Sequence, residues 1–376
     1  MANILEQAAV DPAANLILRN TLLATSVQQS MEVTTTTASK GETKRIKLKN
    51  VGITTRLRIK ISAAVTIGTD ALTASDKSPW SLISNINVMD FNQQKRCDIS
   101  GFHLWAANCM RNRTVYGYNN EAKSATASWP NVSTAIGAGT VDLFLEVPLA
   151  YDRKRDLRGA ILAQSGTGEW SLNISFRNPY LVDGDVDSVY KADGSSGTCT
   201  EGTITITVWQ DYLQPQPLQN NFNGLPVGIT PIPVMDLSTV YALEGMNIQT
   251  DNLSNGAEKL INIPNARTVI GAITSFVNNK AMSNAFSRIR LVANGNQDVN
   301  VDDVVSAQMR MREWLNGDTV NGLFFWEWRD NPLQTWQAGT MQLGFTPNAS
   351  LTTPYIETTF ESFYGSGAVL PGTFTN

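Results

Sequence analysis

The stretch Thr203-Ile204-Thr205-Ile206-Thr207-Val208-Trp209 alternates polar and apolar residues. A period of two places every apolar side chain on one face, which is typical of a β-strand with one buried side. A second alternating strand, Tyr355-Ile356-Glu357-Thr358-Thr359-Phe360, lies near the end of the chain, and a tyrosine (Tyr212, Tyr364) follows each strand. The two strands divide the sequence into halves that end alike. They favour two β-sandwiches of the same kind.

Other segments in both halves show the same period, so the predicted fold class is all-β. In the first half the expected strands are 45–48, 55–65, 81–89, 140–147, 170–176 and 202–212. In the second half they are 257–263, 267–276, 287–292, 322–329, 339–345 and 355–364. Apolar residues at helical spacing indicate short helices at 98–110 and 301–315. Helices inserted between this many strands favour two tandem eight-stranded jelly rolls.

Prolines and an Asn-Gly pair concentrate between the two halves. Proline lacks a backbone N–H and fixes φ, so this stretch cannot form a central strand or continue a helix. We therefore expect it to link two domains. The predicted segments are an N-terminal helical arm at 1–40, a first jelly roll at 41–214, a linker at 215–234, a second jelly roll at 235–366 and a C-terminal tail at 367–376.

The N-terminal arm is predicted to contain a detached amphipathic helix. Asp11-Pro12 is a favourable start, because an acidic residue caps the helix and proline suits the first helical position. The helix is expected to run to about Ser30, before the threonines at 34–37, since β-branched residues favour extended chain. Its apolar residues are Leu16, Ile17, Leu18, Leu22, Leu23 and Val27.

Composition limits the possible functions. The chain has 376 residues, which suits two domains, and its 42% of hydrophobic residues can form a core in each. Only 16% of the residues are charged and the net charge is -4, so a basic surface for nucleic acid is not indicated. The basic runs 44–49 and 153–155 are interpreted as a strand face and an exposed turn. A surface with few charges is expected where other molecules cover it.

Cys97, Cys109 and Cys199 lack the spacing of a zinc site or a disulfide framework. We expect buried free thiols in a reducing compartment. The N-terminus has neither the basic start nor the apolar run of a signal peptide. No window approaches the roughly 18 apolar residues of a membrane span. Synthesis in a cytoplasm is therefore expected.

A catalytic histidine is not indicated. His103 is the only histidine, and its neighbours Phe102, Leu104 and Trp105 suggest a packed environment. The interpretation is a buried ring satisfied by a hydrogen bond to the backbone. A hydrolytic triad or a histidine-rich metal site would have to depend on this single residue.

The carboxylates do not define a site either. Asp183, Asp185 and Asp187 alternate as in a calcium loop, but the downstream glutamate of an EF-hand is missing, so a solvated loop is expected. Glu327 lies among aromatic residues, yet the sequence identifies no second carboxylate for a glycosidase pair. No catalytic residue, metal or cofactor is predicted.

Short segments in a common order carry a resemblance to a known family. They spread from about residue 50 to 345, and the most specific group lies within 147–163. The segments are Asn50-Val51-Gly52-Ile53, Ser100-Gly101-Phe102-His103-Leu104, Val147-Pro148-Leu149-Ala150-Tyr151, Asp156-Leu157, Gly159-Ala160, Leu162-Ala163, Tyr212-Leu213, Asp236-Leu237-Ser238-Thr239-Val240-Tyr241, Leu243-Glu244, Arg329-Asp330 and Pro332. On these residues the chain resembles the major coat protein of tectiviruses, tailless bacteriophages with a membrane inside an icosahedral shell.

The resemblance implies a double jelly roll that forms nearly hexagonal homotrimers. Such trimers would tile an icosahedral capsid around a membrane and genome, next to neighbouring trimers and to vertex and minor capsid proteins. The chain would be a structural protein of the virion, made in a bacterial cytoplasm, with no enzymatic activity and no sequence-specific binding of nucleic acid. In the family the N-terminal segment lies at the inner face. Here that segment would face lipid or neighbouring chains through Leu16, Ile17, Leu18, Arg19, Leu22 and Leu23.

The main alternative is a secreted carbohydrate-binding or adhesive β-sandwich protein. Exposed aromatic residues would serve as stacking platforms, and the candidates are Trp326, Trp328 and Trp336. Secretion would require a signal peptide, which the N-terminus does not resemble. A glycosidase is a more distant alternative.

Overall fold

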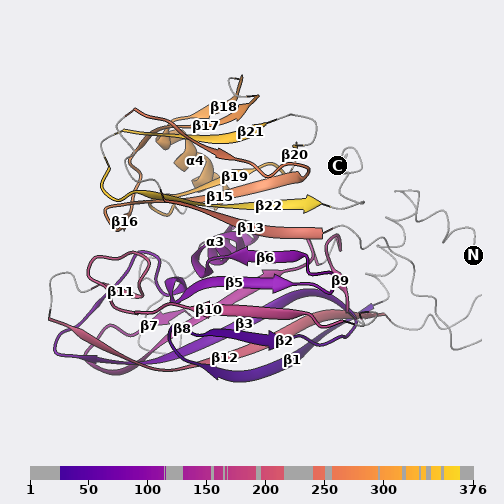
Figure 1. Cartoon of the computed structure of the whole chain (residues 1–376), viewed down its shortest axis with the longest axis vertical. Coiled ribbons are helices and arrows are strands. Elements are labelled where there is room, and N and C mark those ends of the chain that lie inside the picture. Colours follow the sequence, from indigo (N-terminus) through magenta and orange to yellow (C-terminus); the bar gives the residue numbers. More distant parts are fainter. Residues whose placement is uncertain are drawn as a thin grey trace, which may run out of the picture.

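The computed structural model consists mainly of β-strands in two layered bodies (Figure 1). We call residues 26–215 the first sandwich and residues 240–364 the second sandwich. The structure describes residues 26–113, 115, 130–153, 156–163, 166, 168–191, 196–215, 240–249, 256–294, 297–315, 319–329, 332–335, 340–348 and 351–364.

The first sandwich has two facing sheets. One has the order β1 (Ser26–Ala38), β12 (Thr198–Pro215), β3 (Ile53–Gly68), β8 (Gly137–Pro148) and β7 (Asn131–Val132), and β9 (Ile161–Leu162) also pairs with β3. The other has the order β2 (Thr43–Lys47), β10 (Ser171–Phe176), β5 (Ile83–Met89) and β6 (Lys95–Ile99). A small ribbon of β4 (Thr73–Ala74) and β11 (Tyr190–Lys191) and a 3-10 turn at Trp80–Leu82 complete this half.

The second sandwich is built in the same way. One sheet has the order β13 (Val240–Gln249), β22 (Tyr355–Tyr364) and β15 (Thr268–Asn278), and β16 (Ala281–Met282), β19 (Leu323–Glu327) and β20 (Leu333–Gln334) all pair with β15. The facing sheet has the order β14 (Lys259–Asn262), β21 (Met341–Pro347), β17 (Phe286–Ala293) and β18 (Gln297–Asp302).

The two sandwiches have one topology. When the eight principal strands of each half are numbered 1 to 8 in chain order, both halves have sheets of order 1-8-3-6 and 2-7-4-5. The principal strands are β1, β2, β3, β5, β6, β8, β10 and β12 in the first half, and β13, β14, β15, β17, β18, β19, β21 and β22 in the second. This is the strand order of a jelly roll, so the chain is a double jelly roll.

Alternation along the strands forms the two cores. In β3, Leu57, Ile59 and Ile61 are fully buried, and the residues between them face away from the core. Burial of an aliphatic side chain contributes roughly 1.5–3 kcal/mol, so each core is stabilised by many such terms. The second core is richer in aromatic rings, and Phe276 and Phe286 lie with ring centroids 3.9 Å apart.

One continuous sheet joins the two halves. β13 of the second sandwich pairs in parallel with β6 of the first, with Leu243 opposite Cys97 and Glu244 opposite Asp98. The 2-7-4-5 sheet of the first sandwich and the 1-8-3-6 sheet of the second therefore form a single ten-stranded sheet. In Figure 1 this junction crosses the middle of the molecule, with α3 (Gly101–Asn112) beside it.

A helix follows strand 5 in each half, at α3 and at α4 (Val304–Trp314). Ser100 caps α3 by accepting a hydrogen bond from the His103 backbone N–H, and Asp303 caps α4 by accepting one from Ser306. Such caps satisfy backbone donors that have no partner within the helix. Both helices were expected from the sequence, but residues 98–99 and 301–302, assigned to them there, belong to the preceding strands.

The expected N-terminal arm requires a correction. Residues 26–38 were placed within a detached arm at 1–40, yet they form β1, which pairs with β12 along its length. The prediction that a helix reaches about Ser30 is therefore wrong for residues 26–30, and residues 11–25 of that helix lie outside the described residues. β-branched residues and the unpaired edge of β12 favour the extended conformation here. The rest of the arm, the 216–234 part of the linker and the 367–376 tail lie outside the described residues.

Candidate functional site at the seam between the sandwiches

The outward face of β22 forms the contact between the two sandwiches, which we call the seam. Ile356 and Phe360 point into the second core, and the alternate residues Glu357, Thr359 and Glu361 point toward the first sandwich. Two of the latter are carboxylates, Glu357 and Glu361, which are 9% and 1% exposed. Such burial is uncommon for a carboxylate and requires compensating partners.

Helix α3 fills the seam. Residues 101–110 are all buried, because the helix packs on β8 on one side and on β15 and β22 on the other. Asn108 fixes it to β8 by donating to the Glu146 carbonyl oxygen (2.8 Å) and accepting from the Glu146 N–H (3.0 Å). At the other end, a Cβ on Gly101 would lie 2.5 Å from the Trp80 carbonyl oxygen, so only glycine allows this approach.

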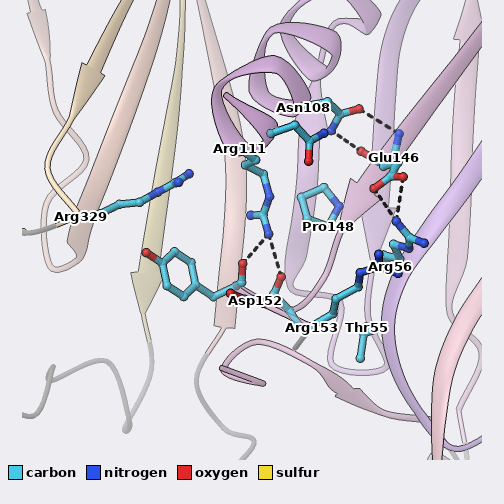
Figure 2. Close-up of a pocket in the computed structure, with 12 residues that line it drawn as sticks. Thr55, Arg56, Asn108, Arg111, Glu146, Pro148, Asp152, Arg153 and Arg329 are labelled. Atoms are coloured by element: carbon cyan, nitrogen blue, oxygen red, sulfur yellow. Dashed lines mark hydrogen bonds and ion pairs between the residues drawn. The ribbon is translucent and has the colours of Figure 1, made fainter. Parts of the chain in front are cut away.

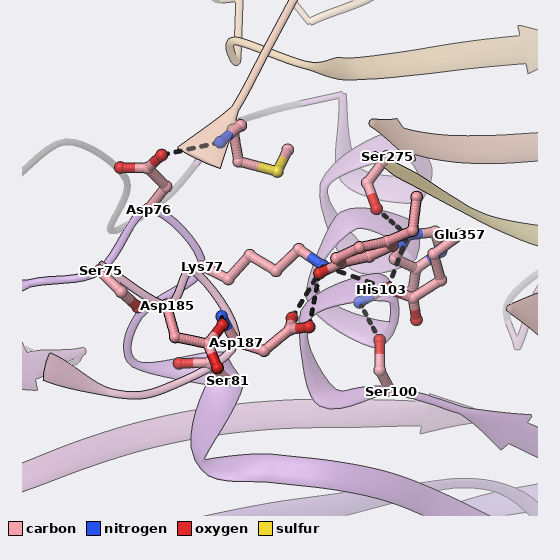
Figure 3. Close-up of polar contacts among 12 residues, drawn as sticks. Ser75, Asp76, Lys77, Ser81, Ser100, His103, Asp185, Asp187, Ser275 and Glu357 are labelled. Carbon is pink, nitrogen blue, oxygen red and sulfur yellow. Dashed lines mark hydrogen bonds and ion pairs between the residues drawn. The ribbon is translucent and has the colours of Figure 1, made fainter. Parts of the chain in front are cut away.

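A lysine from the first sandwich neutralises Glu357 (Figure 3). The Lys77 Nζ lies 3.4 Å from Glu357, 3.0 Å from Asp187 and 2.8 Å from the Tyr355 hydroxyl. Tyr355 in turn donates to Asp187 at 2.5 Å. The Lys77 side chain is 2% exposed, so its charge can remain only because these oxygens surround it. Asp187, expected in a solvated loop, is instead part of this cluster.

The charges of this cluster depend on each other. Burial alone lowers the pKa of Lys77, but Tyr355, Glu357 and Asp187 outweigh burial and hold the pKa above its usual value. Burial alone raises the pKa of Glu357, but the neighbouring His103 and Lys77 and a hydrogen bond from Ser100 hold the pKa below its usual value. Lys77 and Glu357 are therefore both ionised at neutral pH and form an ion pair between the two sandwiches.

His103 lies in the same seam and is fully buried, as predicted. The prediction that its ring is hydrogen-bonded to the backbone is wrong. Nε2 lies 2.8 Å from the Ser275 hydroxyl, and Nδ1 lies 2.8 Å from the Thr359 hydroxyl. Both hydroxyls come from the second sandwich. Burial lowers the pKa of His103 from 6.5 to about 4, so the ring is neutral at pH 7. The histidine therefore joins the two halves by hydrogen bonds.

Two arginines neutralise Glu361. Arg329 of the second sandwich lies 3.0 Å from its carboxylate, and Arg111 at the end of α3 lies 3.3 Å away. Tyr241 of β13 donates to the same carboxylate. Burial alone raises the pKa of Glu361, but Arg329 and Arg111 hold it below its usual value. Arg111 also donates to the backbone carbonyl oxygens of Ala150 and Tyr151, so the cluster fixes the loop after β8.

A cavity of about 360 Å3 opens beside this cluster (Figure 2). Arg111 and Arg329 line one side of it, and Arg56 lines the other. The Arg56 guanidinium is bound by Glu146 at 2.7 Å and by Asp211 at 2.6 Å. Carboxylates pair with each of these three cations, and Arg153 is a fourth arginine in the lining. We interpret the cavity as the open end of the seam.

The remaining predicted residues do not form a site. Trp326 is buried in the second core and Trp328 packs against that core, so neither provides a stacking platform, and Trp336 lies outside the described residues. Cys97 and Cys109 are buried free thiols, as predicted, whereas Cys199 is only half-buried. The arm residues Leu16, Ile17, Leu18, Arg19, Leu22 and Leu23 also lie outside the described residues. In the part of the chain that the structure describes, neither helix is long and apolar enough to cross a membrane.

The seam residues Lys77, Glu357 and Glu361 were not identified from the sequence. Glu357 and Glu361 alternate with apolar residues in their strand, which is also the pattern of a strand with a solvated face. Lys77 lies in a loop, where a lysine is normally exposed. An available signal was the pair of carboxylates four residues apart on one face of a predicted strand.

Comparisons with known proteins agree with this architecture. A family model described as P3 major capsid protein N-terminal matches residues 3–216. The chain is 27% identical to the major capsid protein P3 of Enterobacteria phage PRD1 over 359 residues. This alignment covers 89% of this chain and 87% of that protein. Among solved structures, the STIV MCP, of Sulfolobus Turreted Icosahedral Virus, has a TM-score of 0.65 at 10% identity and covers 90% of this chain and 97% of its own. The PBCV-1 virus capsid has a TM-score of 0.60 at 11% identity, with coverages of 90% and 93%.

Two jelly rolls that share one sheet define a double jelly-roll fold, which the similar solved structures also support. The family match covers more than half of the chain, from residue 3 to residue 216. The chain belongs to the P3 major capsid protein family, and it is a major capsid protein located in the shell of a virion. This confirms the tectivirus resemblance seen in the sequence.

Removing the charge of Glu361 should destabilise the seam strongly. Glu361→Gln leaves Arg111 and Arg329 buried without their shared carboxylate, which is expected to reduce the free energy of unfolding by about 3–5 kcal/mol. Urea denaturation followed by tryptophan fluorescence measures the change. The matched control is Glu169→Gln, because Glu169 is 45% exposed in its surface pair with Arg45 and should contribute less than about 1 kcal/mol. Equal effects of the two substitutions would contradict the assigned role of Glu361.

The single histidine should give stability a distinct pH dependence. A histidine whose folded pKa is lowered binds its proton first in the unfolded chain, so stability falls as the pH drops from 6.5 toward 4. The expected loss is about 1.4 kcal/mol per pH unit within that window. Urea midpoints at pH 7.5, 6.5, 5.8 and 5.0 should show this slope in the wild type. The slope should be lost in His103→Gln, and a variant with the wild-type slope would show that other groups cause it.

Proposed function

We propose that three copies of this chain form a ring of six sandwiches, a pseudo-hexagonal trimer that tiles an icosahedral shell around a membrane and genome. The repeated topology within one chain carries the proposal. Two sandwiches of the same strand order lie side by side in a single chain, so three chains supply six similar units. The buried seam makes each pair of sandwiches one rigid unit, which a closed ring requires.

The proposed role is structural and not enzymatic. Membership of a capsid protein family supports this, and so does the environment of the only histidine. His103 is fully buried and bound on both ring nitrogens, so it cannot reach a substrate. The burial of Trp326 removes support for the carbohydrate-binding alternative. The net charge of -4 supports a shell that makes no sequence-specific contact with nucleic acid.

We further propose that the residues before β1 act at the inner face of the shell. Leu16, Ile17, Leu18, Leu22 and Leu23 provide apolar contacts, and Arg19 provides a single cation. β1 begins at Ser26, so this segment is attached to the edge of the first sandwich. It would contact the internal membrane or neighbouring chains. Neighbouring trimers and vertex and minor capsid proteins are further proposed partners.

The purified chain should be a trimer in solution. Its mass is 41.1 kDa, so light scattering coupled to size-exclusion chromatography should give about three times that value. Negative-stain electron microscopy of the same fraction should show particles with a six-lobed outline. A mass that stays at one chain when the protein is concentrated would overturn the proposed trimer.

Deleting residues 1–25 should separate folding from assembly. The deletion leaves β1 complete, so the variant should keep the thermal midpoint and oligomeric mass of the full chain. Binding to vesicles or incorporation into shells should decrease, because the apolar residues of the arm are removed. Flotation with lipid vesicles and assembly in infected or co-expressing cells measure the two functions. Unchanged results in both assays would refute the proposed role of the arm.

A further inference from the structure

The cavity at the open end of the seam continues into a second one. The second cavity has a volume of about 260 Å3, and the two cavities share Thr55, Arg56 and Arg153 in their linings. Residues 28–30, at the start of β1, also line the second cavity. We call the two cavities together the arginine groove. It lies at the end of the first sandwich where β1 begins.

The lining of the arginine groove is basic, although the chain as a whole is acidic. Its arginines are Arg56, Arg58, Arg111, Arg153 and Arg329, and its carboxylates are Glu146, Asp152 and Asp211. The lining therefore has a net charge of +2, whereas the whole chain has a net charge of -4. The local charge stays positive when Glu361, buried behind two of these arginines, is included. An anion is consequently favoured in the groove.

Three of the arginines keep N–H groups that no described residue binds. Arg56 uses Nε and Nη1 for its two carboxylates, which leaves Nη2. Arg329 binds Glu361 through Nη2 and leaves Nη1. Arg153 forms no ion pair with any described carboxylate. The seam therefore does not use all the donors of the guanidinium groups that line the groove.

The size and chemistry of the groove limit the kind of anion. Sites for small organic ligands have volumes of roughly 300–1,000 Å3. The first cavity, at about 360 Å3, is larger than a bare ion requires and falls at the low end of that range. Arginine binds phosphate oxygens through two parallel N–H groups, which makes it the preferred side chain for phosphate groups. A phosphate that carries a small polar group therefore fits both the volume and the lining.

We propose that the arginine groove binds a small phosphate ester. The phosphate lies between Arg56 and Arg153, the two cations that both cavities share. The polar group of the ester extends across the first cavity toward Arg329, which Figure 2 shows on the opposite side from Arg56, and accepts a hydrogen bond from the unused Nη1. Each guanidinium then gains an oxygen acceptor without losing the carboxylate that it already binds.

Two sources can supply this chemistry, the head group of a phospholipid or a soluble phosphate ester. The lipid source rests on the proposed function, in which residues 1–25 lie at the inner face of the shell. The groove adjoins the start of β1, so it would lie at that same face. The phosphate site itself rests only on the charges and donors of the groove, and it is tested first without lipid.

The first test measures binding of glycerol 1-phosphate to the full chain by isothermal titration calorimetry at constant ionic strength. Arg153→Gln should raise the Kd about tenfold or more, because a charge-assisted contact is lost. The thermal midpoint of the unliganded variant should stay unchanged, because Arg153 forms no ion pair with a described carboxylate. Arg45→Gln is the matched control, since it removes the same charge from a side chain that is 65% exposed and outside the groove. It should bind like the wild type.

The second test identifies the source by flotation with phosphatidylglycerol vesicles. If the ligand is a lipid head group, Arg153→Gln should reduce binding to the vesicles, and glycerol 1-phosphate should compete with them for the wild type. If neither changes flotation while Arg153→Gln still weakens binding of glycerol 1-phosphate, the ligand is a soluble phosphate ester.

Two results of the calorimetry would overturn the site. One is no binding of glycerol 1-phosphate to the wild type at millimolar concentrations, and the other is an equal Kd for the wild type and Arg153→Gln. The calorimetric assay contains no membrane and does not depend on residues 1–25. Failure of the proposed function would appear instead in the mass of the particle and in the shell assay, so the two failures can be distinguished.

Discussion

The buried ion pairs of the seam constrain the rest of the structure. Glu357 and Glu361 belong to the second sandwich, while Lys77 and Arg111 belong to the first. An ionised group inside a protein is tolerated only while its partner stays in place, so separation of the sandwiches would require each of these charges to be solvated again. Because both carboxylates lie on one face of β22, a single strand carries the constraint. The tandem sandwiches consequently behave as one rigid unit.

Rigidity of this kind explains how a shell subunit can use two jelly rolls. A flexible linker alone would let each half take many orientations, and a closed assembly would then lose entropy at every contact. Here the shared sheet through β6 and β13 sets the direction of the strands, and α3 fixes the distance between the halves. The same topology in both halves makes the chain a pair of similar building blocks whose relative position is set before assembly.

The strands were predictable from the sequence because their evidence is local. Alternation identified 202–212 and 355–364, and helical spacing identified most of α3 and α4, since each pattern depends only on which face is apolar. The errors arose where a distant strand decides the conformation. Residues 26–30 continue a helical pattern but pair with β12, and Asp187 looks solvated but meets Lys77 from another loop. Contacts between residues more than 100 positions apart leave no periodic signal.

Burying polar and charged groups in the seam lowers the free energy of unfolding, but it makes the relative position of the two sandwiches specific. Well-packed apolar residues often stabilise an interface as much as a buried ion pair does, but they tolerate sliding. Lys77, His103 and Arg111 each meet a particular acceptor on β15 or β22, so a shift of one residue along the strand would break all three of these contacts between the sandwiches. An error in the angle between two sandwiches would be repeated at every position of an icosahedral shell. Buried charge that permits only one register therefore suits a protein whose function is its geometry.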